Sequence, residues 1–214
     1  MPVTLGVLKD VLLICTSVLF IVDPFAAVPS FLAMTQRDSA EQRRGMARRG
    51  AWTCAVTLTV FALGGRLIFT LFGITLGAFK IAGGVLIGLN ALEMVQARRS
   101  GQQETPIERA EGTLKEDIGI IPLGLPMLAG PGAISTAMVL AGQSRAVITS
   151  VAVYVAIAIT AYISYLTLAG ATLVERRLGQ TGMRILTRLM GLVLCAIAVQ
   201  FIVDGIKMTG LAGS

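Results

Sequence analysis

The chain has 214 residues, of which 55% are hydrophobic and only 14% are charged, and its mean hydropathy is +0.79. A soluble domain would have roughly a quarter of its residues charged. The composition therefore excludes a soluble globular protein and predicts an all-α integral membrane protein. The chain contains no histidine, which excludes catalytic triads built on imidazole, histidine zinc sites and imidazole proton relays.

The cysteines and the net charge indicate no metal, cofactor or nucleic-acid partner. Cys15, Cys54 and Cys195 lie in apolar runs without CxxC spacing, so we interpret them as small hydrophobic residues. The net charge is +6, but the basic residues cluster between apolar segments, where the lipid bilayer explains them. Because the short polar segments hold no nucleotide-binding or catalytic motif, we expect neither an enzyme nor a resident cofactor.

Six apolar runs are each long enough to cross a bilayer core about 30 Å thick, which needs roughly 20 residues of helix. In chain order they cover residues 7–34, 51–72, 74–96, 118–141, 146–173 and 185–208. The first run is longer than a signal-peptide core, so we expect it to remain in the mature protein. A polar stretch, residues 98–116, is predicted to be a cytoplasmic linker between 1–97 and 117–214, the two halves of one membrane domain.

The basic residues are divided unequally between the loops. Loops after the first, third and fifth runs carry 13 Lys and Arg residues, and the remaining segments carry 5. The positive-inside rule places the odd-numbered loops in the cytoplasm. We therefore expect a multi-pass protein of the inner (plasma) membrane with both termini on the outer, periplasmic side.

The two halves of the chain resemble each other. An offset of 107 residues aligns Asp10 with Asp117, Pro24 with Pro131 and three further identical pairs, and an offset of 108 aligns Gly83 with Gly191. Because each half has three expected spans, an odd number, the second half must enter the membrane from the opposite side. The expected fold is thus six transmembrane helices in a 3+3 inverted repeat.

Prolines and glycines predict that the first and fourth helices are broken. The first contains Asp23-Pro24 and Pro29, and the fourth contains Gly130-Pro131-Gly132. Proline lacks an N–H and clashes with the preceding turn. Asp10 to Asp23 and Asp117 to Gly130 are each 13 residues, about 20 Å of helix, which places both breaks near the bilayer midplane. Irregular backbone near the midplane is tolerated only where it is buried in protein or lines a cavity, so we expect a substrate site where the two breaks meet.

Asp23 is the carboxylate expected near the midplane, where an ionisable residue is a functional candidate. An Asp before a Pro is also a good helix cap, and the two roles are compatible. The hydroxyls of Ser135 and Thr136 could bind a substrate or bond back to helix carbonyls. The candidate substrate-binding residues are Asp23, Pro24, Phe25, Ala26, Asn90, Gly130, Pro131, Gly132, Ser135 and Thr136.

Polar residues elsewhere in the helices receive structural interpretations. We expect Lys80 and Arg188 to extend to lipid headgroups, with gating as the alternative. Asp204 shares a helix face with Gln200 and is expected to be solvated near the outer end. The Gly84–Gly88 spacing predicts close helix packing.

Five sequence segments resemble the MarC family: 22–29, 72–74, 81–84, 122–126 and 128–136, with 187–191 and 204–206 continuing the match in the same order. The resemblance spans nearly the whole chain. It implies a six-helix membrane protein of bacteria and archaea, and archaeal members are described as transporters of glycine and alanine. Ala26-Ala27 stands where the family usually has a glycine, which puts the size of the substrate in doubt.

The sequence thus favours a secondary transporter of small neutral amino acids that works by alternating access. An exporter of drugs or other small metabolites is the alternative, although a wide apolar cavity needs aromatic walls and only 6% of the residues are aromatic. A non-transporting membrane scaffold protein is another. The coupling ion, Na⁺ or H⁺, and the oligomeric state stay open.

Overall fold

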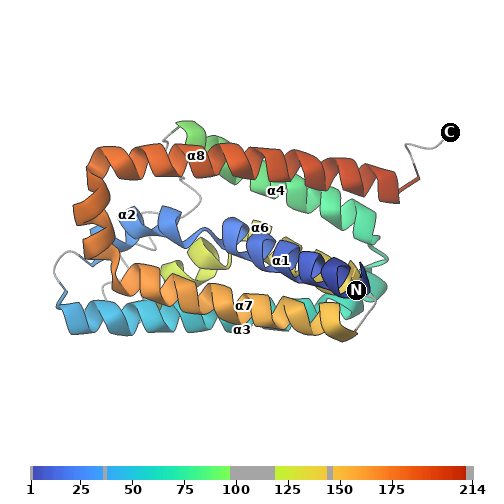
Figure 1. Ribbon diagram of the computed structural model, residues 1–214, viewed down its shortest axis with the longest axis horizontal. Coiled ribbons are helices and arrows are strands. Elements are labelled where there is room, and N and C mark those ends of the chain that lie inside the picture. The colour runs from blue at the N-terminus through green and yellow to red at the C-terminus, as the bar shows by residue number, and fades with distance from the viewer. Residues whose placement is uncertain (1, 36–37, 97–118, 144–146, 211–214) are drawn as a thin grey trace.

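The computed structural model describes residues 2–35, 38–96, 119–143 and 147–210, and these residues form helices and no strand. The expected linker, 98–116, lies outside the described residues. The elements are α1 (Pro2–Val22), α2 (Pro24–Met34), α3 (Ala40–Phe72), α4 (Leu76–Gln96), the irregular helical segment η1 (Gly119–Leu128), α6 (Pro131–Gln143), α7 (Val147–Ala169) and α8 (Ala171–Met208) (Figure 1).

Local sequence signals explain several helix boundaries. α3 begins with a capping box, in which Ser39 Oγ accepts from Gln42 N and the Gln42 side chain accepts from Ser39 N. It ends at Gly73, which has a positive φ of 64°. The fifth expected run, 146–173, is divided differently, because α7 ends at Ala169 and α8 begins at Ala171. Gly170 separates the two helices, and glycine has a low helix propensity.

Four helical stretches among the described residues are long and apolar enough to cross a membrane: Lys9–Met34, Leu76–Gln96, Val147–Ala169 and Thr181–Met208. The pair η1 and α6 makes a fifth if it is one span bent by 62°. The expected run 51–72 forms the second part of the 33-residue helix α3, whose first third carries five charged residues. The described residues therefore give four or five candidate spans, where the sequence predicts six.

The helices pack as two groups with separate hydrophobic cores. The larger core contains buried residues of α1, α2, α3, η1, α6 and α7 together with the start of α8. The smaller core consists of Ile87 and Ala91 from α4 and Leu194 and Ala198 from α8. Figure 1 shows α4 and α8 side by side along most of their length.

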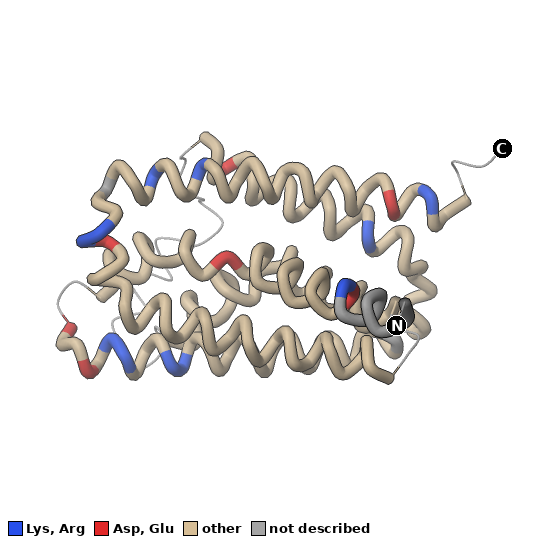
Figure 2. The backbone as a smooth tube through the Cα atoms, viewed as in Figure 1, with Lys and Arg blue, Asp and Glu red and all other residues tan. Residues whose placement is uncertain are grey.

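Charged residues are concentrated at the two ends of the molecule. Figure 2 shows most of the described Lys and Arg residues at the end where α3 begins and α8 bends. α1 begins and α8 finishes at the opposite end (Figure 1). The elongated middle is almost free of charge, as expected for the part of a protein that contacts lipid tails.

Candidate functional site

Asp23 interrupts the first long helix. It lies between α1 and α2 with a left-handed backbone (φ 42°, ψ 69°), which is uncommon for a residue other than glycine. Its N–H donates to Leu19 O at 3.0 Å, and its carboxylate oxygen Oδ1 accepts from Ala26 N at 3.2 Å. Asp23 is therefore the N-cap of α2, with Pro24 at the first helical position.

The second carboxylate oxygen of Asp23 has no hydrogen-bond partner. The residue is only 6% exposed, and Oδ2 is one of four buried side-chain oxygens without a partner among the described residues. Burying such an oxygen without a donor is unfavourable by roughly 1–3 kcal/mol or more. Oδ2 is thus available to a cation or an N–H donor that enters the site.

The second break lies between η1 and α6. Ile121 and Leu125 adopt extended backbones (φ −126° and −136°) because each precedes a proline, which disfavours the helical conformation. α6 then begins at Pro131, and the Gly130 carbonyl accepts from Ile134 N at 3.0 Å. Glycine has no side chain to bond the first amides of a helix, so the first turn of α6 lacks the side-chain cap that Asp23 gives to α2.

A cavity of about 190 Å³ lies where the two breaks meet. Its walls come from α1, α2, α4, η1, α6 and α8, so both groups of helices enclose it. The lining residues are Ile21, Val22, Asp23, Ala26, Ala27, Leu86, Ile87, Leu89, Asn90, Met94, Pro126, Met127, Leu128, Gly130, Pro131, Gly132, Ala133 and Leu194. The cavity is mainly apolar, with the Asp23 carboxylate, the Asn90 amide and the irregular backbone as its polar groups.

The family comparison covers this whole site. The model of the MarC family, described as "MarC family integral membrane protein", matches residues 8–209. The chain belongs to the MarC family. It is therefore an integral membrane protein that crosses the membrane several times.

Relatives from distant organisms match along most of their length. The UPF0056 membrane protein MJ1677 of Methanocaldococcus jannaschii is 42% identical over 94% of this chain and 97% of its own. A UPF0056 membrane protein of Aquifex aeolicus is 37% identical over 89% of each chain, and YhcE of Escherichia coli is 35% identical over 87% of each. No solved structure matches this MarC-family chain.

Six of the ten candidate residues line the cavity of this MarC-family protein. They are Asp23, Ala26, Asn90, Gly130, Pro131 and Gly132. Pro24 is buried as the first residue of α2 and Phe25 is 36% exposed, and neither lines the cavity.

The two hydroxyl candidates are buried behind the cavity wall. Ser135 Oγ and Thr136 Oγ1 both donate to the Gly132 carbonyl, at 3.0 and 2.9 Å. Of the two roles considered from the sequence, these contacts correspond to bonding back to the helix. The hydroxyls thus help to fix the first turn of α6.

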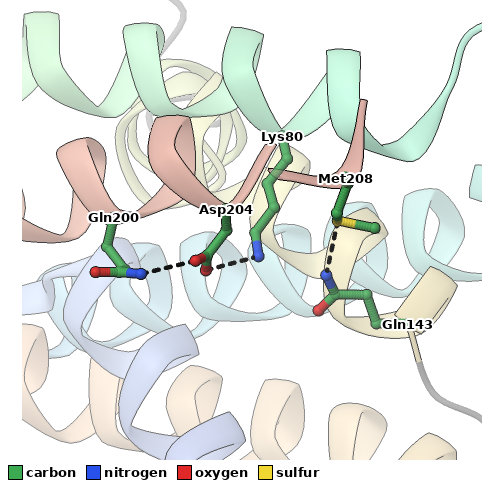
Figure 3. Close-up of polar contacts among 5 residues, drawn as sticks. All are labelled: Lys80, Gln143, Gln200, Asp204 and Met208. Carbon is green, nitrogen blue, oxygen red and sulfur yellow. Dashed lines mark hydrogen bonds and ion pairs between the residues drawn. The ribbon is translucent and has the colours of Figure 1, made fainter. Parts of the chain in front are cut away.

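The expectation that Lys80 reaches lipid headgroups is wrong. Lys80 on α4 is 7% exposed, and its Nζ lies 3.1 Å from Asp204 Oδ2 on α8 (Figure 3). Gln200 Nε2 donates to the other oxygen of Asp204 at 2.7 Å, and the Phe201 ring lies 5.4 Å from Nζ. A buried ammonium group needs such a partner, and α8 supplies it. Arg188, by contrast, is exposed.

The apolar lining residues were not predicted as part of the site. Ile87 on α4 and Leu194 on α8 are residue types that are typical of membrane-spanning helices, so their identity alone does not indicate a cavity. The spacing on α4 gives a partial indication of the cavity, because Leu86, Leu89 and Asn90 share one helix face. No group of three or more His, Cys, Asp and Glu side chains that could hold a metal ion occurs within the described part of the chain.

Proposed function

We propose that this protein is a secondary transporter of small neutral amino acids, with its substrate site in the Asp23 cavity. One observation carries the proposal: Asp23, which has a buried carboxylate oxygen without a partner, and the start of α6, a helix N-terminus without a side-chain cap, line the same cavity. The partial positive charge of a helix N-terminus favours anions. The cavity therefore offers one position for a carboxylate and one for an ammonium group.

The difference between Asp23 and Gly130 orients the substrate. α2 and α6 begin at Pro24 and Pro131, which are 107 residues apart, and the residues before them are Asp23 and Gly130. Asp23 bonds the first turn of α2 with its own carboxylate. In the proposed complex, the substrate carboxylate takes the corresponding place at α6, and the substrate ammonium group contacts Asp23 Oδ2.

The size of the cavity favours a small substrate. Its volume is about 190 Å³. Pockets for drug-sized ligands have roughly 300–1,000 Å³. This comparison supports a glycine- or alanine-sized substrate over the alternative of drug export.

The proposal includes six membrane spans in a 3+3 inverted repeat. α3, with 33 residues, is long enough to be the sixth span, since a bilayer core needs roughly 20. Packing supports the repeat: α1 and α2 pack on α7 as η1 and α6 pack on α3, and α4 and α8 pack on each other. The start of α1 and the end of α8 lie at one end of the molecule (Figure 1), as an even number of spans requires.

The proposed orientation follows from the distribution of charge. Most described basic residues lie at the end opposite the termini (Figure 2), and the positive-inside rule assigns that end to the cytoplasm. Both termini then lie on the periplasmic side of the inner membrane. Transport is coupled to a Na⁺ or H⁺ gradient. The relatives are named as membrane proteins without a substrate, so the cavity carries the functional proposal.

The experiment is counterflow in vesicles that contain purified protein and unlabelled glycine. Labelled glycine outside should enter the vesicles in exchange, and this readout needs no knowledge of the coupling ion. Asp23→Asn is the informative variant, because Asn also caps helices and tolerates a left-handed backbone but has no charge for the ammonium group. We expect counterflow to fall by about tenfold or more. Glu175→Gln, an exposed residue away from the cavity, is the matched control and should exchange like the wild type.

Three outcomes would contradict the proposal. Folded wild-type protein that exchanges neither glycine, alanine nor another neutral amino acid would favour a scaffold protein. Exchange that is unchanged in Asp23→Asn would remove the carboxylate from substrate binding. Competition of bulky drugs with labelled glycine for exchange would favour the drug exporter instead.

A further inference from the structure

The cavity lies on the boundary between the two groups of helices. Asp23, Ala26 and Gly132 line it from the larger group, and Leu86 and Leu194 line it from α4 and α8. Each group has its own hydrophobic core, although Met183, just after the bend of α8, belongs to the larger core and Ile21 of α1 packs against both. A movement of one group against the other would therefore change access to the cavity while leaving most of each core intact.

α4 and the Thr181–Met208 part of α8, together called the α4–α8 unit, are held closely along their length. A Cβ on Gly84 would lie 2.8 Å from Ala198 O, and one on Gly191 would lie 3.0 Å from Ala91 O, so the two backbones approach closely at separate levels. The ion pair of Lys80 and Asp204 adds a third contact (Figure 3). Separating the two helices would break all of these contacts.

Two contacts between the α4–α8 unit and α6 lie on one side of the cavity. A Cβ on Gly83 would lie 2.7 Å from Ser135 Oγ. Nearer the end of α8, Gln143 Nε2 lies 3.7 Å from Met208 Sδ (Figure 3). Ser135 follows the cavity-lining Gly132 on α6, and Gln143 is the last residue of that helix. These contacts lie between the cavity and the end of the molecule that carries the termini.

Glycines with positive φ mark the two junctions between the unit and the larger group that the structure describes. The third connection, from α4 to η1, runs through residues 97–118, outside the described residues. Gly73 (φ 64°) ends α3 just before α4, and Gly179 (φ 64°, ψ 175°) bends α8 just before Thr181. Residues before the bend, Ala171 and Val174, pack on the larger core. These backbone conformations are accessible mainly to glycine, and nothing lies within 4 Å of either added Cβ. Both junctions thus have the backbone of a hinge.

We propose that the α4–α8 unit moves as one body against the remaining helices, and that its contact with α6 at Gly83 and Ser135 opens and closes the Asp23 cavity toward the end with the termini. The Lys80–Asp204 pair stays formed during this movement. The inference rests on the proposed transport function for its purpose. Each group would contain helices from both halves of the chain.

Two neighbouring glycines of α4 allow a matched cross-linking test. An added Cβ on Gly83 would lie 3.0 Å from Ser135 Cβ in the larger group, and one on Gly84 would lie 3.1 Å from Phe201 Cβ within the unit. Both distances need a similar widening to reach the ~3.5–4.5 Å of a disulfide. The two pairs are made as double cysteine variants in a chain whose Cys15, Cys54 and Cys195 are replaced by alanine.

We expect the two disulfides to have opposite effects on glycine counterflow. Oxidation of Gly83→Cys/Ser135→Cys should reduce glycine counterflow by about tenfold or more, and a reductant should restore it. Oxidation of Gly84→Cys/Phe201→Cys should leave at least about half of the activity of its reduced form. Loss of counterflow in both oxidised proteins, or in neither, would overturn the proposal.

A second measurement separates this inference from the proposed function. Spin labels at the exposed positions Val85 and Val199 report a distance within the unit, and labels at Val85 and Val60 report one between the unit and α3. In vesicles we expect one narrow distance for the first pair and two populations for the second. A single distance between the unit and α3, or two within the unit, would overturn the inference even if no substrate were transported.

Discussion

Lys80 Nζ on α4 and Asp204 Oδ2 on α8 form an ion pair at 3.1 Å across 124 residues of sequence. Lys80 is buried, whereas about a third of the Asp204 side chain is exposed. The pair therefore lies between the limits of a solvated surface pair, worth roughly 0–1 kcal/mol, and a fully buried one. Its main consequence is that neither partner can be changed alone without an effect on the other.

The first prediction concerns this dependence. Asp204→Asn leaves the buried Lys80 ammonium without its counter-charge and should destabilise the protein by about 1–3 kcal/mol. Lys80→Met removes the buried charge and keeps an apolar chain, so it should destabilise less. Thermal unfolding of the purified variants in detergent measures both. Equal losses of stability in the two single variants would show that the burial of Lys80 does not determine the cost of breaking the ion pair.

A second prediction tests the uncapped N-terminus of α6. Gly130→Asp places a carboxylate where Asp23 stands before α2, and this side chain should occupy the proposed position of the substrate carboxylate. Counterflow should fall by about tenfold or more. Gly130→Ala is the control, because it adds the same Cβ, 3.0 Å from Pro126 O, without a capping group. If both variants lose counterflow equally, the added Cβ explains the loss and the amides of α6 are not the anion site.

Substrate size is the third prediction. Leu86 lines the cavity, whereas its neighbour Val85 does not. Leu86→Ala should enlarge the cavity and raise the exchange of valine relative to glycine by several-fold, because one or two methylene groups in an apolar pocket change specificity by about 1–3 kcal/mol. Val85→Ala should leave the ratio unchanged. An unchanged ratio in Leu86→Ala as well would place the substrate side chain elsewhere.

The bend of α8 gives the fourth prediction. Gly179→Ala forces a side chain into a backbone conformation that costs of order 1–3 kcal/mol for residues other than glycine, so it should lower the melting temperature. Gly45 lies inside α3 with nothing within 4 Å of an added Cβ and without a positive φ. Gly45→Ala should therefore stabilise the protein by about 0.5–1 kcal/mol. A melting temperature of Gly179→Ala at or above that of the wild type would exclude a strained conformation at this position.

The breaks in the helices were visible in the sequence, because proline and glycine act through the local backbone. Asp23-Pro24 and Gly130-Pro131 are the boundaries at which α2 and α6 begin. The boundary between α7 and α8 at Gly170 was missed, since apolar residues continue on both sides of it. A single glycine in such a run gives no distinct signal, as glycines also occur within helices such as α4.

Contacts between distant segments could not be predicted. Lys80 and Asp204 are charged residues near helix ends, and that position alone favours contact with headgroups; their pairing depends on the register of α4 against α8. By residue type alone, the hydroxyls of Ser135 and Thr136 could either bind a substrate or bond back to helix carbonyls. Only the position of the Gly132 carbonyl, 3.0 and 2.9 Å away, distinguishes between them.

The most direct test of the proposed substrate site is an experimental structure of the protein with glycine bound. We predict that glycine lies in the cavity between α2 and α6, with its carboxylate within about 2.7–3.2 Å of amides in the first turn of α6 and its ammonium group at a similar distance from Asp23 Oδ2. Glycine bound outside this cavity, or with its carboxylate directed at Asp23, would contradict it.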